Sequence, residues 1–179
     1  MIEVETKVLV RNPDFIRKRA RVLGKFIGKE KKVDDYYTLE ALDHYPQKSL
    51  RIRKIDGYYI VNFKQRLSYK KGVHAKNEVE FKVSNINDFL RLIEDFGFRK
   101  WLTKEKRCEV FEIRKNFHIE LNRVKGLGWF VEIERLSDVR GIAKAREEVV
   151  GIIRELGFAK KDVVKSGYTK LLWDKRNKK

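Results

Sequence analysis

Two pairs of glutamates at alternate positions are the first feature that could do chemistry. Glu3 and Glu5 form one pair, and Glu132 and Glu134 form the other. On a β-strand, this spacing puts two carboxylates on one face about 6.5 to 7 Å apart. Such a pair can share one or two hard cations and is costly without them. The alternative for either pair alone is a solvated strand face that is ion-paired to neighbouring lysines.

Basic side chains follow the same two-residue interval elsewhere in the chain. Arg51 is spaced in this way from Arg53, and Lys64 from Arg66. If the strands belong to one closed or strongly curved sheet, their charged faces converge on a single cavity. That cavity would hold a triphosphate, because the cations would neutralise phosphate oxygens while the carboxylates held Mg²⁺ or Mn²⁺ against them. The alternative is an open sheet with a wet polar face.

The elements that must position these residues are strands with one apolar and one charged face. In residues 2–10, apolar side chains occupy most even positions, while Glu3, Glu5 and Lys7 occupy odd ones. Alternation of this kind predicts a strand with two chemically different faces. Similar alternation predicts further strands at 50–53, 61–66, 78–83, 118–122 and 131–134.

Three segments show helical periodicity instead. Residues 12–23 begin with Asn12 and Pro13, a capping side chain followed by a proline that suits the first helical position. Apolar stripes at helical spacing predict helices at 87–96 and at 138–156 as well. A strand with a Glu-x-Glu face followed by an amphipathic helix recurs, so we expect an α+β fold with helices on the apolar outer face of a sheet-rich body.

Composition limits the class of protein. A chain of 179 residues is long enough for one domain, so we expect a single domain over 1–179. No apolar run reaches the roughly 20 residues that span a bilayer, and the charged start is unlike a signal peptide, so a cytoplasmic protein with no membrane partner is expected. The single cysteine, Cys108, cannot form an internal disulfide, and three scattered histidines lack zinc-site spacing.

The net charge of +17 requires a polyanionic partner, substrate or counterion. Nucleic acid is the general explanation for such a charge, and a phosphate-rich small molecule is the more specific one. Adaptation to a hot environment would also increase surface charge without any ligand. Nucleic acid is not expected as a partner, because paired glutamates on the charged strand faces would repel its backbone.

Taken together, the motifs resemble the CYTH family of triphosphate tunnel metalloenzymes, which includes class IV adenylyl cyclases and thiamine triphosphatases. The family's Glu-x-Glu-x-Lys signature stands at residues 3–7. The remaining matches follow in family order along nearly the whole chain: Asp35-Tyr36-Tyr37, Leu50-Arg51-Ile52-Arg53, Phe63-Lys64, Glu78-Val79-Glu80, Gly126-Leu127-Gly128, Glu132-Ile133-Glu134, Ser166-Gly167-Tyr168 and Leu171-Leu172.

The resemblance implies an eight-stranded antiparallel β-tunnel flanked by helices, with the charged faces inward. It implies that the carboxylates that hold the metal are Glu3, Glu5, Glu132 and Glu134. These four residues and Lys7 would also be the catalytic residues. It implies triphosphate-binding cations at Lys7, Arg51, Arg53, Lys64, Lys76, Lys106 and Arg107. It also implies supporting carboxylates in the same tunnel at Glu78, Glu80 and Glu120.

The chain departs from the family pattern at three places. Lys76 stands where the family often has an arginine, and Asn122 stands where it often has an aspartate, for which Glu120 could compensate. Around Lys106, Arg107 and Cys108, the family pattern aligns with this chain in more than one register.

The expected activity is metal-dependent cleavage of an organic or inorganic triphosphate, without a covalent enzyme intermediate. Attack by water on the terminal phosphorus would make a triphosphatase, and attack by a ribose 3′-hydroxyl on the α-phosphorus would make an adenylyl cyclase. The alternative is a non-catalytic protein that binds nucleic acid or polyphosphate. A monomer or a homodimer is expected.

Overall fold

Eight antiparallel strands close into a barrel in the computed structural model, which describes residues 2–55, 58–70 and 72–177, with the side chains of 64–66 left out. The order around the barrel is β1-β5-β4-β3-β2-β6-β7-β8, and β8 pairs with β1 to close it. The strands are β1 (Ile2–Val10), β2 (Lys25–Thr38), β3 (Leu50–Ile55), β4 (Tyr58–Lys70), β5 (Val73–Val83), β6 (Arg99–Arg114), β7 (Phe117–Val124) and β8 (Gly128–Ser137). The predicted fold class is confirmed.

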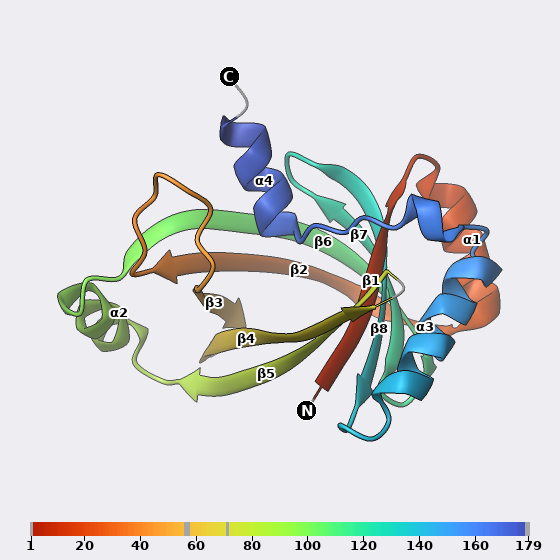
Figure 1. The fold of residues 1–179 in the computed structure, drawn as a ribbon, viewed down its shortest axis with the longest axis horizontal. Helices are drawn as coiled ribbons and strands as arrows, with labels where there is room; N and C mark the ends of the chain where they lie inside the picture. The colour runs from red at the N-terminus through yellow and green to blue at the C-terminus, as the bar shows by residue number, and fades with distance from the viewer. Residues whose placement is uncertain (1, 56–57, 71, 178–179) are drawn as a thin grey trace.

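Four α-helices flank this barrel in the described part of the chain (Figure 1). They are α1 (Pro13–Leu23), α2 (Ile86–Asp95), α3 (Ile142–Glu155) and α4 (Tyr168–Asn177), with one 3₁₀ turn, η1 (Lys160–Asp162). Figure 1 shows α1 and α3 near β1 and β8, α2 at the far end of the molecule, and α4 beside β6 and β7. None of these helices is long and apolar enough to cross a membrane.

Local chemistry explains where the helices start and stop. The side chain of Asn12 accepts a hydrogen bond from the backbone N–H of Phe15 at 3.1 Å, and Pro13 occupies the first turn of α1. Helix α3 begins at Ile142, four residues later than the periodicity predicts. The side chain of Asp138 accepts a hydrogen bond from the N–H of Gly141 at 2.6 Å, which holds the intervening residues in a turn.

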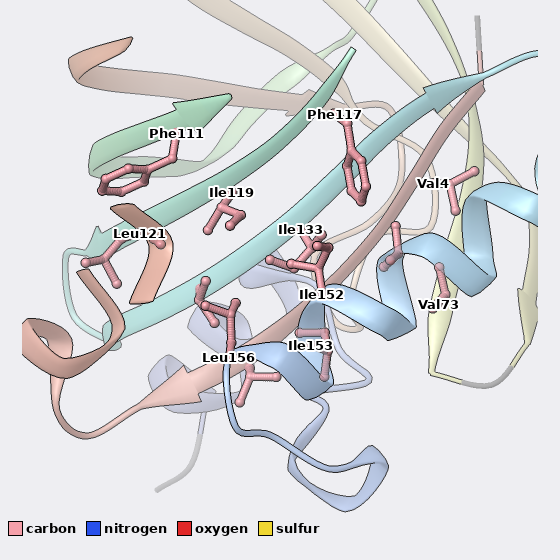
Figure 2. Close-up of a cluster of buried hydrophobic side chains, with 14 of the residues drawn as sticks. Val4, Val73, Phe111, Phe117, Ile119, Leu121, Ile133, Ile152, Ile153 and Leu156 are labelled. Carbon is pink, nitrogen blue, oxygen red and sulfur yellow. The ribbon is translucent and has the colours of Figure 1, made fainter. Parts of the chain in front are cut away.

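The main hydrophobic core lies outside the barrel, between its wall and the helices. Figure 2 shows Ile152 and Ile153 of α3 near Ile133 of β8, with Phe117 and Ile119 of β7 close by. All five side chains are buried. Because successive strand residues point to opposite faces, committing one face of β1, β7 and β8 to this core sends the alternate residues into the barrel. This confirms the prediction that the helices pack on the apolar outer face.

Candidate functional site in the barrel interior

Three glutamates converge on the inner wall formed by β1 and β8. Glu3 and Glu5 lie on β1, and Glu134 lies directly opposite Glu5 on β8. One carboxylate oxygen from each lies within 4.8 Å of the others. Glu3 and Glu5 are buried, at 5% and 7% exposed. Oxygen donors gathered so closely fit a hard divalent cation, because without a counterion their negative charges repel one another.

Lys76 on β5 partly balances this cluster, since its ammonium group forms an ion pair with Glu5. In the β1–β5 register, Lys76 is also the partner of Glu3. The sequence predicts Lys76 as a triphosphate ligand, and the structure places it at the edge of the three carboxylates.

Glu132, the fourth predicted metal ligand, lies outside this three-carboxylate cluster. Its Oε2 accepts hydrogen bonds from Asn122 Nδ2 at 2.8 Å and from Lys106 Nζ at 3.3 Å. Its Oε1 lies 3.9 Å from Lys7 Nζ, in a pairing that joins β1 to β8. The structure therefore brings Glu132 together with cations and an amide.

Glu120 on β7 extends the same network. It accepts hydrogen bonds from Lys106 at 2.7 Å and from Lys32 at 2.8 Å. Burial alone would raise the pKa of Glu120, but Lys106 and then Lys32 hold that pKa well below its usual value. Burial would likewise lower the pKa of Lys106, yet Glu120 and Glu132 raise it well above the ordinary value. Both groups therefore stay charged in the barrel interior.

A second buried network occupies the wall formed by β2, β3 and β6. Arg53 donates two hydrogen bonds to Asp34, from Nε to Oδ1 at 2.6 Å and from Nη2 to Oδ2 at 3.0 Å. Lys104 Nζ lies 2.8 Å from Asp34 Oδ2, and the Asp34 side chain is fully buried. Burial opposes ionisation of Asp34, but Lys104 and Arg53 lower its pKa well below the ordinary value. This wall thus carries a fixed anion between two fixed cations.

Arg51 forms the neighbouring part of this wall. Its Nη2 donates to Glu78 Oε1 at 3.2 Å and lies 4.0 Å from Glu80 Oε2. Asn62 also donates to Glu78. The Nε of Arg51 is buried and has no hydrogen-bond partner among the described residues. A buried N–H without a partner is costly, so this donor is suited to an anion that enters the barrel.

Tyr168, the first residue of α4, closes the interior near these networks. Its ring packs edge-on against Phe130 at 5.0 Å, and the ammonium groups of Lys7 and Lys104 lie 5.3 and 5.8 Å from the ring centre. Burial, followed by the charge of Glu132, raises the pKa of the Tyr168 phenol well above its ordinary value. The phenol therefore stays protonated, which leaves a neutral aromatic surface against two cations.

One predicted triphosphate ligand, Arg107, is not brought to this interior, and the side-chain position of another, Lys64, is not described. The side chain of Lys64 lies outside the described part of the structure. Arg107 is exposed, whereas its neighbours Lys106 and Cys108 are buried. Strand alternation therefore puts Arg107 on the outer face of β6, opposite the face that carries Lys106.

The interior also holds residues that sequence reasoning did not place there. Lys32 and Asp34 are spaced by two in β2, which is the same signal that identified the two basic pairs. Lys104 is spaced by two from Lys106 in β6 in the same way. Asn62 lies two residues before Lys64 in the predicted strand 61–66, but an amide does not stand out on a charged face. Tyr168 falls within a family match but has no strand periodicity that would place it in the interior.

Comparison with known proteins agrees with this architecture. The CYTH domain family profile matches residues 1–168. A Methanocaldococcus jannaschii protein named "Putative adenylate cyclase" is 28% identical over 174 residues, covering 96% of this chain and 98% of its own. Among solved structures, the PH1819 protein of Pyrococcus horikoshii superposes with a TM-score of 0.80 at 28% identity, covering 97% of this chain and 99% of its own. The PH1012 protein of the same organism gives 0.79 at 29% identity, covering 94% and 98%.

Proposed function

Because the chain belongs to the CYTH domain family, we propose that its barrel binds an organic or inorganic triphosphate together with Mg²⁺ or Mn²⁺ and cleaves the phosphate chain. The chain is an enzyme of the adenylate cyclase and triphosphatase type. The observation that carries the proposal is the cluster of Glu3, Glu5 and Glu134 in a closed barrel whose other walls present buried cations.

The carboxylate cluster is the proposed metal site. Glu3, Glu5 and Glu134 supply only oxygen ligands, which suit Mg²⁺ and Mn²⁺. When bound, the cation would supply Lewis-acid polarisation of phosphate oxygens. Its positive charge would also replace that of Lys76 beside Glu5, leaving the Lys76 ammonium group available to a phosphate oxygen. Glu132 is proposed to orient Lys7 and Lys106.

The cations on the remaining walls are the residues proposed to bind the triphosphate. Among the described residues, Lys7 is held by a long 3.9 Å ion pair with Glu132 and by its contact with the Tyr168 ring, so it can turn towards an entering anion at small cost. The buried Nε of Arg51 offers a further donor. Arg53 is held in place by Asp34 before any ligand arrives, so its orientation needs no reorganisation. Lys64 stays a prediction from the family pattern.

The nucleophile is proposed to come from water or from the substrate. Burial raises the pKa of the Cys108 thiol to about 11, which leaves it protonated and unreactive at neutral pH. Attack by water on the terminal phosphorus would release orthophosphate. Attack by a ribose 3′-hydroxyl on the α-phosphorus would release pyrophosphate and form cyclic AMP.

The direct test is incubation with ATP, thiamine triphosphate or inorganic tripolyphosphate, with Mg²⁺, Mn²⁺ or EDTA. Orthophosphate, pyrophosphate and cyclic AMP are measured separately, which distinguishes hydrolysis from cyclisation. Glu3→Gln and Glu134→Gln should each lower metal-dependent turnover on the order of 100-fold or more while circular dichroism stays unchanged. Glu147→Gln, an exposed change on α3, is the matched control. Wild-type rates in both tunnel variants would contradict the proposed metal site.

A further inference from the structure

The charge of the tunnel does not account for the charge of the chain. In the described part of the tunnel, carboxylates are at least as numerous as cations. The carboxylates are Glu3, Glu5, Asp34, Glu78, Glu80, Glu120, Glu132 and Glu134, and the cations are Lys7, Lys32, Arg51, Arg53, Lys76, Lys104 and Lys106. The excess behind the net charge of +17 therefore lies largely outside the barrel, and a triphosphate in the tunnel does not explain it.

Part of this excess forms a row across the outer face of the barrel. Lys31 of β2 pairs in register with Arg107 of β6, which pairs with Arg123 of β7, which pairs with Trp129 of β8. The three cations are exposed. Neighbouring strands lie about 4.8 Å apart, and like charges placed directly opposite each other destabilise a sheet. A row of this kind is costly unless an anion lies over it.

The row crosses a hollowed surface. Two adjoining hollows, of about 620 and about 360 Å³, share Arg107 and Arg123 in their linings. Lys125 and Lys175 line the larger hollow, and Trp129 lines the smaller one. We refer to this surface, from Lys31 through Arg107 and Arg123 to Lys175 and Trp129, as the outer groove.

The cations of the outer groove are poorly neutralised by the protein. Glu105 contacts both Lys31, at 3.5 Å, and Lys125, at 3.4 Å. Within residues 2–55, 58–70 and 72–177, neither Arg107 nor Arg123 forms an ion pair. The guanidinium of Arg123 instead lies 6.0 Å from the centre of the Trp129 ring. Heat adaptation alone would favour paired surface charges, and these two arginines are not paired.

We propose that the outer groove binds a single-stranded nucleic acid, independently of catalysis in the tunnel. Arg107 and Arg123 would contact backbone phosphates. Trp129 packs partly against the core, with Arg17 and Arg123 each 6.0 Å from its ring centre, and its exposed part would stack on a base. The combination of a cationic groove with an aromatic platform is the chemistry that single strands require. The argument that paired glutamates repel a nucleic-acid backbone does not apply here, because the fold points the paired glutamates of β1 and β8 into the barrel.

The test measures binding of a labelled RNA of roughly 20 mixed-sequence nucleotides by fluorescence anisotropy, between about 50 and 200 mM salt. The RNA carries a 5′-hydroxyl and the buffer contains EDTA, so the tunnel's proposed metal and triphosphate sites take no part. Arg107→Glu/Arg123→Glu should weaken binding at least roughly tenfold and lower the salt slope by about 2. Lys144→Glu/Arg154→Glu, which makes the same charge change at exposed positions on α3, should leave binding within about twofold of wild type.

Two further measurements distinguish binding in the outer groove from non-specific attraction of RNA to a basic protein. Trp129→Ala should weaken RNA binding while leaving the salt slope unchanged, because it removes stacking and no phosphate contact. Triphosphate cleavage should be unchanged in Arg123→Glu. Absence of RNA binding by the wild-type chain, or equal losses in both double-charge variants, would overturn the proposal. Binding of inorganic polyphosphate or of duplex RNA as tightly as single-stranded RNA would also overturn it.

Discussion

Replacing Asp34 by asparagine tests whether the buried network on β2, β3 and β6 is held together by charge. The substitution keeps the shape of the side chain but removes the negative charge between Arg53 and Lys104. Asp34 is fully buried, so both cations would be left beside a neutral amide. Removing one partner of a buried ion pair typically costs about 3 to 5 kcal/mol. Because asparagine retains one carbonyl acceptor, we expect a loss near the lower end, about 3 kcal/mol.

The measurement is equilibrium unfolding in urea at pH 7, supported by thermal unfolding. For a chain of this length, each kcal/mol corresponds to about 2 to 4 °C, so Asp34→Asn should lower Tm by about 6 to 12 °C. The folded-state pKa of Asp34 is depressed, so its stabilisation is fully present above the ordinary pKa of 3.8 and is lost only as the pH falls below it. A pH of 7 therefore reports the whole effect.

Asp35→Asn is the matched control for this experiment. Asp35 is the next residue on β2, but it points to the outer face, where it pairs with Lys100 at 2.8 Å with both side chains partly exposed. Exposed pairs contribute about 0 to 1 kcal/mol. Tripolyphosphate should also raise Tm more in Asp34→Asn than in wild type, because an entering anion can pair with Arg53 and Lys104 after they lose the Asp34 carboxylate. Similar losses in the two variants, or a loss below about 1 kcal/mol in Asp34→Asn, would refute the reasoning.

Three further outcomes follow from the structure. Lys76→Met should bind Mn²⁺ more tightly in the absence of substrate, because the metal ion no longer competes with an ammonium group for Glu5. Calorimetry measures this affinity, and an unchanged value would contradict the prediction. Cys108 should resist a thiol reagent until the chain is unfolded in urea, because burial raises its pKa to about 11; rapid labelling of the native protein would contradict this. Burial, followed by Lys76 and Lys7, lowers the pKa of His74 from 6.5 to about 4. Its contribution to stability is therefore present above pH 6.5 and lost as the pH falls through 4, so His74→Gln should lose less stability than wild type between pH 7 and 4 in urea titrations.

The strands that the sequence predicted are those with one apolar face. β1, β7 and β8 pack against α1 and α3, so their outer residues are apolar and their inner residues are charged. That contrast gives a clear period of two. The same contrast allowed Glu3, Glu5 and Glu134 to be identified as residues that share the barrel interior.

The two longest strands, β2 and β6, were not predicted. In β2, the inner residues Lys32 and Asp34 belong to the charged tunnel, while the outer residues Lys29 and Lys31 are exposed. Both faces are polar, so alternation between side-chain classes disappears even though the strand is regular. Asp34 was missed for this reason, although it anchors Arg53. The contacts of Glu132 with Lys7, Lys106 and Asn122 were equally inaccessible, because a sequence does not show which groups will surround a carboxylate.

The paired charges of the interior suggest how the barrel remains stable before a ligand enters. Two buried carboxylates away from the proposed metal site are already matched to cations: Asp34 lies between Arg53 and Lys104, and Glu120 between Lys32 and Lys106. Isolated buried charges would destabilise the fold by several kcal/mol each, so this pairing is a condition for closing a charged barrel at all. A triphosphate with its metal brings both signs of charge, and can therefore exchange partners with the wall without leaving either sign uncompensated. The outer groove lacks this internal balance, which is why we expect its ligand to be a polyanion alone.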